Sequence, residues 1–356
     1  MKRLQALEGL RGYAAFLVFL VHFCGLVAAR GLGIDPDATS IFDARGPLAV
    51  ALFFFRSHYG VDLFFVLSGL LMADIAARRW PGTRTFLARR ALRIYPAYLA
   101  AGALALAAGL WIFGRRITPG ELAANAAMLH GFAVLDIAPV NPVTWSLSYE
   151  VAFYLAVPLL ALAWGRRAPG TRPANAAWIL AACFVAIVAV AAALPFKRAM
   201  YLAYFALFIP GLWLGMMDEE SRVRAARNLP TGLALGAWIA FTLAFKLGVF
   251  SAADPLYYVA SAAACGLLVL KTCDGASLPG RLLASRPALA LGRISYSFFL
   301  VHFIVLHVLG EALVKAGVTQ PAAFAAALFA AGFALSLAAA WALFHVAESF
   351  YFGRRS

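Results

Sequence analysis

Ten ionisable side chains fall inside stretches of this sequence that are otherwise apolar. A charged side chain at the centre of a bilayer costs about 2.5 to 3.5 kcal/mol on insertion scales, so a chain that keeps one usually pairs it, hydrates it or uses it. Imidazole groups accept protons near neutral pH, carboxylates stabilise cations, and guanidinium groups bind anions. The candidates for such chemistry are Arg11, His22, Asp62, Asp74, Glu150, Lys246, His302, His307, His345 and Glu348.

Arg11 and His22 lie eleven residues apart in the first apolar stretch. At 100° per residue they are about 1100° apart around a helix, which is about 20° from three full turns. They therefore share one face and lie roughly 16 Å apart along the helix axis. A shared face favours a common functional site. The structural alternative is an arginine that reaches the interface and a histidine hydrogen-bonded to a neighbouring helix.

Three arginines open another apolar stretch, in the segment FLARRALRIYPAY at 86–98. Arg89, Arg90 and Arg93 are three and four residues apart, so on a helix they cluster about one turn. A cytoplasmic anchor is the usual role of such a run. Anchoring explains the number of charges but not the exclusive use of arginine, whereas bidentate binding of phosphates does.

Polar groups also begin the segment NPVTWSLSYEVAFYLAVPLL at 141–160. Helix capping accounts for its hydroxyl groups. Glu150, however, lies about two turns into the predicted helix, where we expect it to face a base, a cation or water. In GVDLFFVLSGLLM at 60–72, Ser68 and Gly69 predict close helix packing. Structural roles are expected for His302, His307, His345 and Lys246.

Membrane-spanning helices must position these groups. Hydrophobic residues make up 64% of the 356 positions and charged residues only 13%, which is too apolar a balance for soluble domains. Windows of roughly 20 apolar residues, interrupted at Pro, Gly and charge clusters, predict about ten spans. These are 8–29, 59–77, 92–113, 143–164, 175–194, 199–217, 230–250, 255–272, 289–313 and 322–347. The shorter stretch 121–135 is expected to be interfacial or re-entrant. The predicted fold is all-α, a polytopic membrane helix bundle in a single domain, 1–356.

The net charge of +14 is explained by orientation in a bilayer. The basic residues form short runs between spans, without the aromatic-rich soluble module of a nucleic-acid-binding protein, so the expected partner is lipid and not nucleic acid. Positive-inside bias favours a topology with both termini in the cytoplasm. The inside then holds Lys2, Arg3, Arg78, Arg79, Arg84, Arg89, Arg90, Arg93, Arg166, Arg167, Arg172, Arg222, Arg224, Arg227, Lys271, Arg281, Arg286, Arg293, Arg354 and Arg355. The outside holds Arg30, Arg45, Arg56, Arg115, Arg116, Lys197, Arg198 and Lys315.

Six segments, taken in order, resemble the acyltransferase-3 family of bacterial membrane acyltransferases. They are LEGLRGYAAFLVFLVHF, GVDLFFVLSG, the RRxxRIYP segment, WSLSxE, LGRISYSFFLVH and the late Glu348. The family usually has a second acidic residue after the WSLSxE glutamate, where this chain has Val151, so a role for two adjacent carboxylates is not expected. Some members carry a C-terminal hydrolase-like domain outside the membrane. No such domain is expected in this sequence, which ends at Ser356.

The resemblance implies transfer of an acyl group, most often acetyl from acetyl-CoA, to a hydroxyl of a carbohydrate, a lipid-linked glycan or a small hydroxylated acceptor, at the inner membrane of a bacterium. Arg89, Arg90 and Arg93 are then candidates for binding coenzyme A phosphates. His22 is the candidate general base, because a neutral imidazole can take the acceptor's proton. Glu150 could orient it or stabilise the imidazolium, and Arg11 supports the same site.

Neither a metal nor a tightly bound cofactor is expected. The four cysteines, at 24, 183, 265 and 273, have no metal-site or disulfide spacing and are expected to be small hydrophobic residues. A covalent acyl-His or acyl-Cys24 intermediate remains an alternative to direct transfer. A proton-coupled transporter that uses intramembrane His, Glu and Arg is the alternative function, although no inverted repeat is visible in the sequence.

Overall fold

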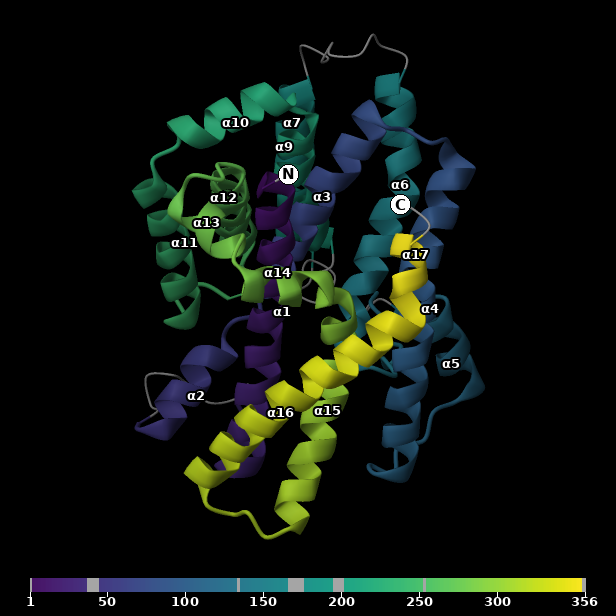
Figure 1. Cartoon of the computed structure of the whole chain (residues 1–356), viewed down its shortest axis with the longest axis vertical. Coiled ribbons are helices and arrows are strands. Elements are labelled where there is room, and N and C mark those ends of the chain that lie inside the picture. Colours follow the sequence, from purple (N-terminus) through teal and green to yellow (C-terminus); the bar gives the residue numbers. More distant parts are fainter. Residues whose placement is uncertain are drawn as a thin grey trace.

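The computed structural model describes residues 2–36, 45–132, 135–165, 176–194, 202–251 and 254–353. Within these ranges the chain forms helices and no strands, which confirms the all-α prediction (Figure 1). The helices are α1 (Lys2–Leu26), α2 (Pro47–Phe55), α3 (Gly60–Arg78), α4 (Thr83–Trp111), α5 (Pro119–Ala126), α6 (Trp145–Gly165), α7 (Ala176–Ala192), α9 (Phe208–Met216), α10 (Glu219–Asn228), α11 (Thr231–Lys246), α12 (Pro255–Thr272), α13 (Leu278–Leu283), α14 (Arg286–Arg293), α15 (Ser295–Lys315), α16 (Pro321–Leu343) and α17 (Ser349–Gly353). Short turns of other helix types are η1 (Val27–Gly31) and η5 (Phe344–Glu348), both π-helical, and η3 (Pro142–Thr144) and η4 (Phe205–Leu207), both 3₁₀.

Seven helical segments of the described chain are long and apolar enough to cross a membrane. They are Gln5–Gly31, Leu48–Arg78, Thr83–Trp111, Pro142–Ala163, Pro255–Thr272, Ser295–Lys315 and Pro321–Tyr351. An eighth crossing results if α10 and α11, which meet at a bend of 80°, form one broken span. The expected spans 175–194 and 199–217 contain shorter apolar helices, Ala177–Ala192 and Leu202–Met216. The polytopic bundle is therefore confirmed, and the number ten is approximate.

Helix boundaries differ from the apolar windows at several places. α4 begins at Thr83, ahead of its expected start, because Gly82 with φ 88° ends the preceding turn and the arginine-rich segment is itself a good helix former. The expected span 289–313 is broken at Ile294, between α14 and α15. The stretch 121–135 holds the end of the short helix α5, followed by irregular chain where it is described.

Glycines allow α3 and α9 to pack closely. A Cβ atom on Gly69 would lie 2.2 Å from the Phe208 carbonyl oxygen, and one on Gly211 would lie 1.9 Å from the Val66 carbonyl oxygen. Neither helix could approach so near with a larger residue at the crossing. The packing role predicted for Gly69 is therefore confirmed.

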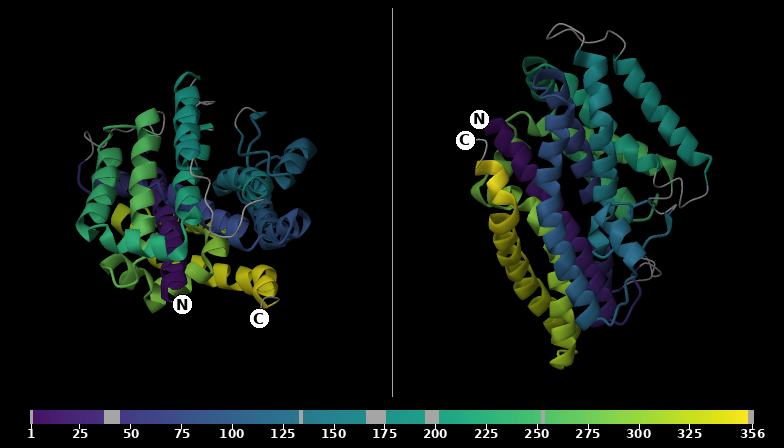
Figure 2. Two further views of the ribbon diagram at one scale, coloured as in Figure 1. Left: turned by 90° about the horizontal axis from the view of Figure 1, so that it is seen from above. Right: turned by 90° about the vertical axis from the view of Figure 1, so that its right-hand side faces the viewer.

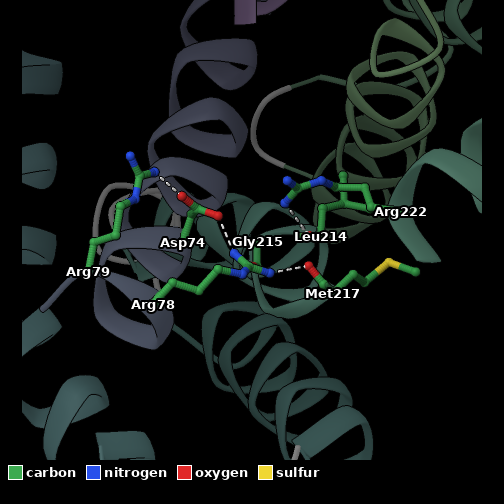
Figure 3. A network of polar contacts seen from close by, with 7 residues as sticks. All are labelled: Asp74, Arg78, Arg79, Leu214, Gly215, Met217 and Arg222. Carbon is green, nitrogen blue, oxygen red and sulfur yellow. Dashed lines mark hydrogen bonds and ion pairs between the residues drawn. The ribbon is translucent and has the colours of Figure 1, made fainter. Parts of the chain in front are cut away.

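Arginines satisfy the last carbonyl groups of α9, where a helix leaves acceptors without intrahelical partners. Arg222 donates to the Leu214 carbonyl at 3.0 Å, and Arg78 donates to the Gly215 carbonyl at 3.1 Å. Asp74 in turn pairs with Arg78 and with the arginine that follows it. Figure 3 shows the whole network, formed by Asp74, Arg78, Arg79, Leu214, Gly215, Met217 and Arg222. These residues fix the end of a helix, which is a structural role.

The first helix is the centre of the bundle. α1 packs against α3, α14 and α15, and α15 packs along α16. In Figure 1 the α10–α13 group lies on one side of α1, α4 and α6 lie on the other, and α16 runs diagonally across the lower half of the view. α1 begins and α17 ends toward the same end of the molecule (Figures 1 and 2). A topology with both termini on one face of a membrane requires this arrangement.

Candidate active site

A cavity of about 80 Å³ lies where α1, α3, α4, α6 and α15 meet. We call it the arginine cavity. It brings together four of the predicted site residues, Arg11, Arg90, Arg93 and Glu150, from three separate helices. The side chain of Arg89 is exposed and does not line it. The remaining lining residues are Phe64, Phe65, Leu67, Ser68, Leu71, Met72, Ile94, Ser146, Leu147, Tyr154, Tyr296 and Phe299.

Arg93 is held in place by a buried ion pair with Glu348. Glu348 lies in the π turn η5, has no exposed side-chain surface, and also accepts a hydrogen bond from Ser297 on α15. The Arg93 guanidinium lies over the Tyr296 ring at 5.4 Å and the Tyr351 ring at 6.0 Å. The pair therefore ties α4, α15 and the C-terminal helices together at the wall of the cavity.

Arg11 and Arg90 are not neutralised in this way. Within the described part of the chain, neither forms an ion pair with a carboxylate. Arg90 lies 5.7 Å from the ring centroids of both Phe86 and Tyr154, and it donates a hydrogen bond to Tyr351 at 3.3 Å. Its Nε has no hydrogen-bond partner. Two guanidinium groups without a carboxylate partner at one cavity form an arrangement suited to an anion such as a phosphate.

Glu150 faces the same cavity and is bound by hydroxyl groups. Its carboxylate accepts hydrogen bonds from Ser68 Oγ at 2.9 Å and from the Tyr154 hydroxyl. Ser68 thus joins α3 to α6 through a polar contact, besides the close packing expected of it. The structure places Glu150 among the arginines and not beside His22.

His22 lines a second cavity, of about 480 Å³, which we call the histidine cavity. Arg56 and His58, from the segment between α2 and α3, also line it. Within the described ranges Arg56 forms no ion pair. Aromatic residues make up much of the wall. The remaining lining residues are Val18, Val21, Pro36, Phe55, Val61, Val143, Trp145, Tyr204, Phe245, Gly248, Phe250, Ser251 and Phe299.

Phe299 lines both cavities. It lies on α15 and is 5% exposed, so its ring fills space between the arginine cavity and the histidine cavity. Arg11 lines the cavity on one side of the Phe299 ring, and His22, on the same helix α1, lines the cavity on the other side. The arrangement can keep an anionic group among the arginines while a reacting group meets the imidazole.

Sequence reasoning missed several lining residues for an identifiable reason. Arg56 and His58 fall between predicted spans, so the cost of burial did not single them out. Tyr154 and Tyr296 resemble ordinary aromatic core residues in sequence, and only the fold shows that they face Arg90 and Arg93. The sequence offers one signal for His58, because this histidine directly precedes Tyr59, where a predicted span begins.

Asp62 and Lys246 are buried, have structural partners and line neither of the two cavities. Asp62 accepts hydrogen bonds from Tyr257 at 2.5 Å and Ser261 at 2.6 Å. Lys246 donates to the Phe53 carbonyl at 2.6 Å and to Ser57 at 3.1 Å. These bonds join α3 to α12 and α11 to α2, and those of Lys246 agree with the structural role expected for it.

Comparison with known proteins gives a consistent result. Residues 4–345 match the family model described as an acyltransferase domain. The chain is 29% identical over 337 residues to "Acyltransferase MdmB" of Streptomyces mycarofaciens, covering 85% of this chain and 79% of that protein. It is 29% identical over 280 residues to "Exopolysaccharide production protein ExoZ" of Rhizobium meliloti, covering 76% and 83%. It is also 29% identical over 286 residues to "Nodulation protein 10" of Rhizobium leguminosarum bv. viciae, covering 70% and 72%. No solved structure shows a significant match.

Proposed function

Because this chain belongs to the acyltransferase domain family, we propose that it is a membrane enzyme that transfers an acyl group from acyl-CoA to an acceptor hydroxyl. Acetyl-CoA is the donor proposed, and a carbohydrate, a lipid-linked glycan or a small hydroxylated molecule is the acceptor. The name of the ExoZ relative, which refers to exopolysaccharide production, supports a carbohydrate. The proposed location is the inner membrane of a bacterium, with both termini cytoplasmic.

The observation that carries this proposal is the pair of cavities that meet at Phe299. One contains unpaired guanidinium groups, and the other contains a histidine. An acyl thioester needs both environments, since its phosphates are anionic and its carbonyl must meet a base and a nucleophile. The acyl end would therefore reach past Phe299 while the phosphates stay with the arginines.

On the donor side, Arg90 and Arg11 are the groups proposed to bind coenzyme A phosphates. Arg90 Nε has no hydrogen-bond partner, and neither arginine forms an ion pair within the described ranges, whereas Arg93 is already paired with Glu348. Arg89, exposed on the same helix, would contact the nucleotide outside the cavity. Glu150 lines the same cavity as these arginines, so its carboxylate would offset part of their positive charge beside the pantetheine arm. This role replaces the expected action of Glu150 on His22.

On the acceptor side, His22 is the proposed general base. The acceptor oxygen attacks the thioester carbonyl carbon, and its proton passes to the neutral imidazole. The carbon–sulfur bond then breaks, and the coenzyme A thiolate takes the proton back from His22. Direct transfer is favoured over an acyl-Cys24 intermediate because Cys24 lines a separate apolar cavity with Leu20 and Phe23, which does not include His22.

The test is transfer of radiolabel from acetyl-CoA to a membrane or glycan extract by the purified protein in lipid nanodiscs. His22→Gln should lower turnover by about 100-fold or more, the lower range for a positioned general base, while acetyl-CoA binding is kept. His345→Gln is the matched control, since His345 is exposed and hydrogen-bonded within its own helix. If the wild-type protein transfers label to no fraction, the proposed reaction is refuted. Near-normal turnover of His22→Gln would refute the role of His22.

A further inference from the structure

His302 is a buried histidine that the proposed mechanism does not use. It lies on α15, is 0% exposed, and packs its ring against Phe19 and Phe298. Its neighbour on α15 is Phe299, the residue shared by the two cavities. A fully buried imidazole in an aromatic surrounding needs partners for both ring nitrogens.

One nitrogen of His302 has a partner and the other does not. Nδ1 lies 3.0 Å from the carbonyl oxygen of Phe298, one turn earlier on the same helix. A carbonyl oxygen can only accept, so Nδ1 carries the proton in the neutral ring and Nε2 is left with a lone pair. Nε2 has no hydrogen-bond partner in the described structure. A buried acceptor without a donor is uncommon in a native fold.

The nearest polar ring is that of His22. The centroids of the two imidazoles are 5.3 Å apart and their planes are inclined by 43°. Two imidazoles joined by an N–H···N hydrogen bond of about 2.9 Å have ring centroids roughly 5 Å apart. A small rotation of His22 would therefore bring a His22 N–H to the lone pair of His302. One water between the two rings could also link these nitrogens by hydrogen bonds. His22 itself has no hydrogen bond within the described residues.

We propose that His302 is a positioning residue that accepts a hydrogen bond from His22 and thereby fixes which His22 nitrogen is free to take a proton. The inference rests on the proposed acyl transfer for its consequence in turnover, and on the geometry alone for the contact. A base with one nitrogen held as a donor presents its other nitrogen to the acceptor hydroxyl, as the orienting group does in a hydrolase triad. His302 stays neutral throughout, and the proton that His22 receives leaves with the thiolate.

His307 provides a matched control on the same helix. Its Nδ1 also lies 3.0 Å from the carbonyl oxygen one turn earlier, that of Phe303, so its local hydrogen bonding equals that of His302. Its ring stacks on Phe303 at 3.8 Å and lines neither cavity. A substitution at His307 therefore tests the loss of a histidine from α15 without the contact to His22.

The experiment compares His302→Phe, His302→Gln and His307→Phe with the wild-type protein in nanodiscs. Phenylalanine preserves ring volume and removes the acceptor, whereas glutamine keeps an acceptor oxygen. We expect His302→Phe to lower kcat about 10-fold or more at an unchanged KM for acetyl-CoA, because the residue acts on the base and not on donor binding. His302→Gln should keep kcat within a few-fold of wild type, and His307→Phe should match wild type. In a His22→Gln background, His302→Phe should cause no further loss, since it acts through His22.

A second measurement does not depend on turnover. Diethyl pyrocarbonate modifies neutral imidazoles, and mass spectrometry of the His22 peptide gives the rate. We expect this rate to fall several-fold in His302→Phe and to stay near wild type in His302→Gln and His307→Phe. If the protein transfers no acyl group but this pattern holds, the proposed function fails and the His22–His302 contact stands. Equal modification rates in wild type and His302→Phe, or full additivity with His22→Gln, would overturn the inference.

Discussion

Replacing Glu348 by glutamine removes the negative charge that pairs with Arg93 while leaving the size of the side chain almost unchanged. The amide oxygen can still accept the hydrogen bond from Ser297. The change therefore isolates the effect of the charge. The Glu348 side chain is 0% exposed and that of Arg93 is 12% exposed, so bulk water has little access to replace the lost partner.

The expected magnitude follows from this burial. Removing one partner of a buried ion pair costs about 3 to 5 kcal/mol, because the other charge is left uncompensated. At about 2 °C per kcal/mol, the value for large chains, the melting temperature should fall by about 6 to 10 °C. The double variant Arg93→Gln/Glu348→Gln removes both charges and should recover more than half of this loss.

Thermal unfolding in one detergent, followed by tryptophan fluorescence and by loss of monodisperse protein, measures both quantities. Asp74→Asn is a useful comparison, since Asp74 pairs with two arginines, one of them 68% exposed, and should cost less. A decrease below about 2 °C for Glu348→Gln, or additive decreases in the double variant, would contradict the claim that the pair stabilises the bundle by mutual neutralisation.

Three further predictions follow from other contacts. Arg90→Lys should raise the KM for acetyl-CoA several-fold at unchanged kcat, because lysine lacks the bidentate fork; an unchanged KM would leave Arg90 with a packing role only. Cysteines introduced at Ser285 and Ala316, in a cysteine-free background, should react with an impermeant maleimide from opposite faces of the membrane, because one crossing, α15, separates them; labelling from the same face would contradict that crossing. Burial opposes ionisation of Asp274, but the Lys271 ammonium at 2.9 Å and the hydrogen bond from the Ala276 N–H together outweigh it and hold the pKa of the carboxyl below its ordinary value. Because the folded pKa is depressed, the stabilisation is present above the unfolded pKa of about 3.8 and is lost as pH falls below it. Asp274→Asn should remove this acid dependence from melting curves, and an identical pH dependence in the variant would refute it.

Part of the candidate site, namely which residues line the two cavities, could be predicted from residue types and helical spacing. The cost of placing Arg11 and His22 in an apolar helix and the 100° rule identified a shared face on α1, and the arginine cluster pointed to an anion site. These are local properties, because they depend on one helix at a time. Membership of the acyltransferase domain family likewise favours a transferase over the transporter alternative.

What could not be predicted depends on contacts between helices far apart in sequence. Glu150 bonds to Ser68, 82 residues away, and Arg93 pairs with Glu348, 255 residues away. No spacing rule gives either pair, since each depends on how α3, α4, α6 and η5 are oriented in the bundle. The neighbour of His22 is His302 on α15, and its importance appears only when the tautomer set by the Phe298 carbonyl is considered.

The π turn η5 has a consequence for how this chain tolerates insertions and deletions. A π turn holds about one more residue than an α turn, and each residue of an α-helix rotates the chain by about 100°. Deleting one residue upstream of Glu348 would let the helix relax to regular α geometry and keep that carboxylate facing Arg93, but it would shift α16 relative to α15. Deleting one residue just after Glu348 would instead rotate Tyr351 away from Arg90. The same change in length would therefore disturb helix packing in the first case and the surroundings of Arg90 in the arginine cavity in the second.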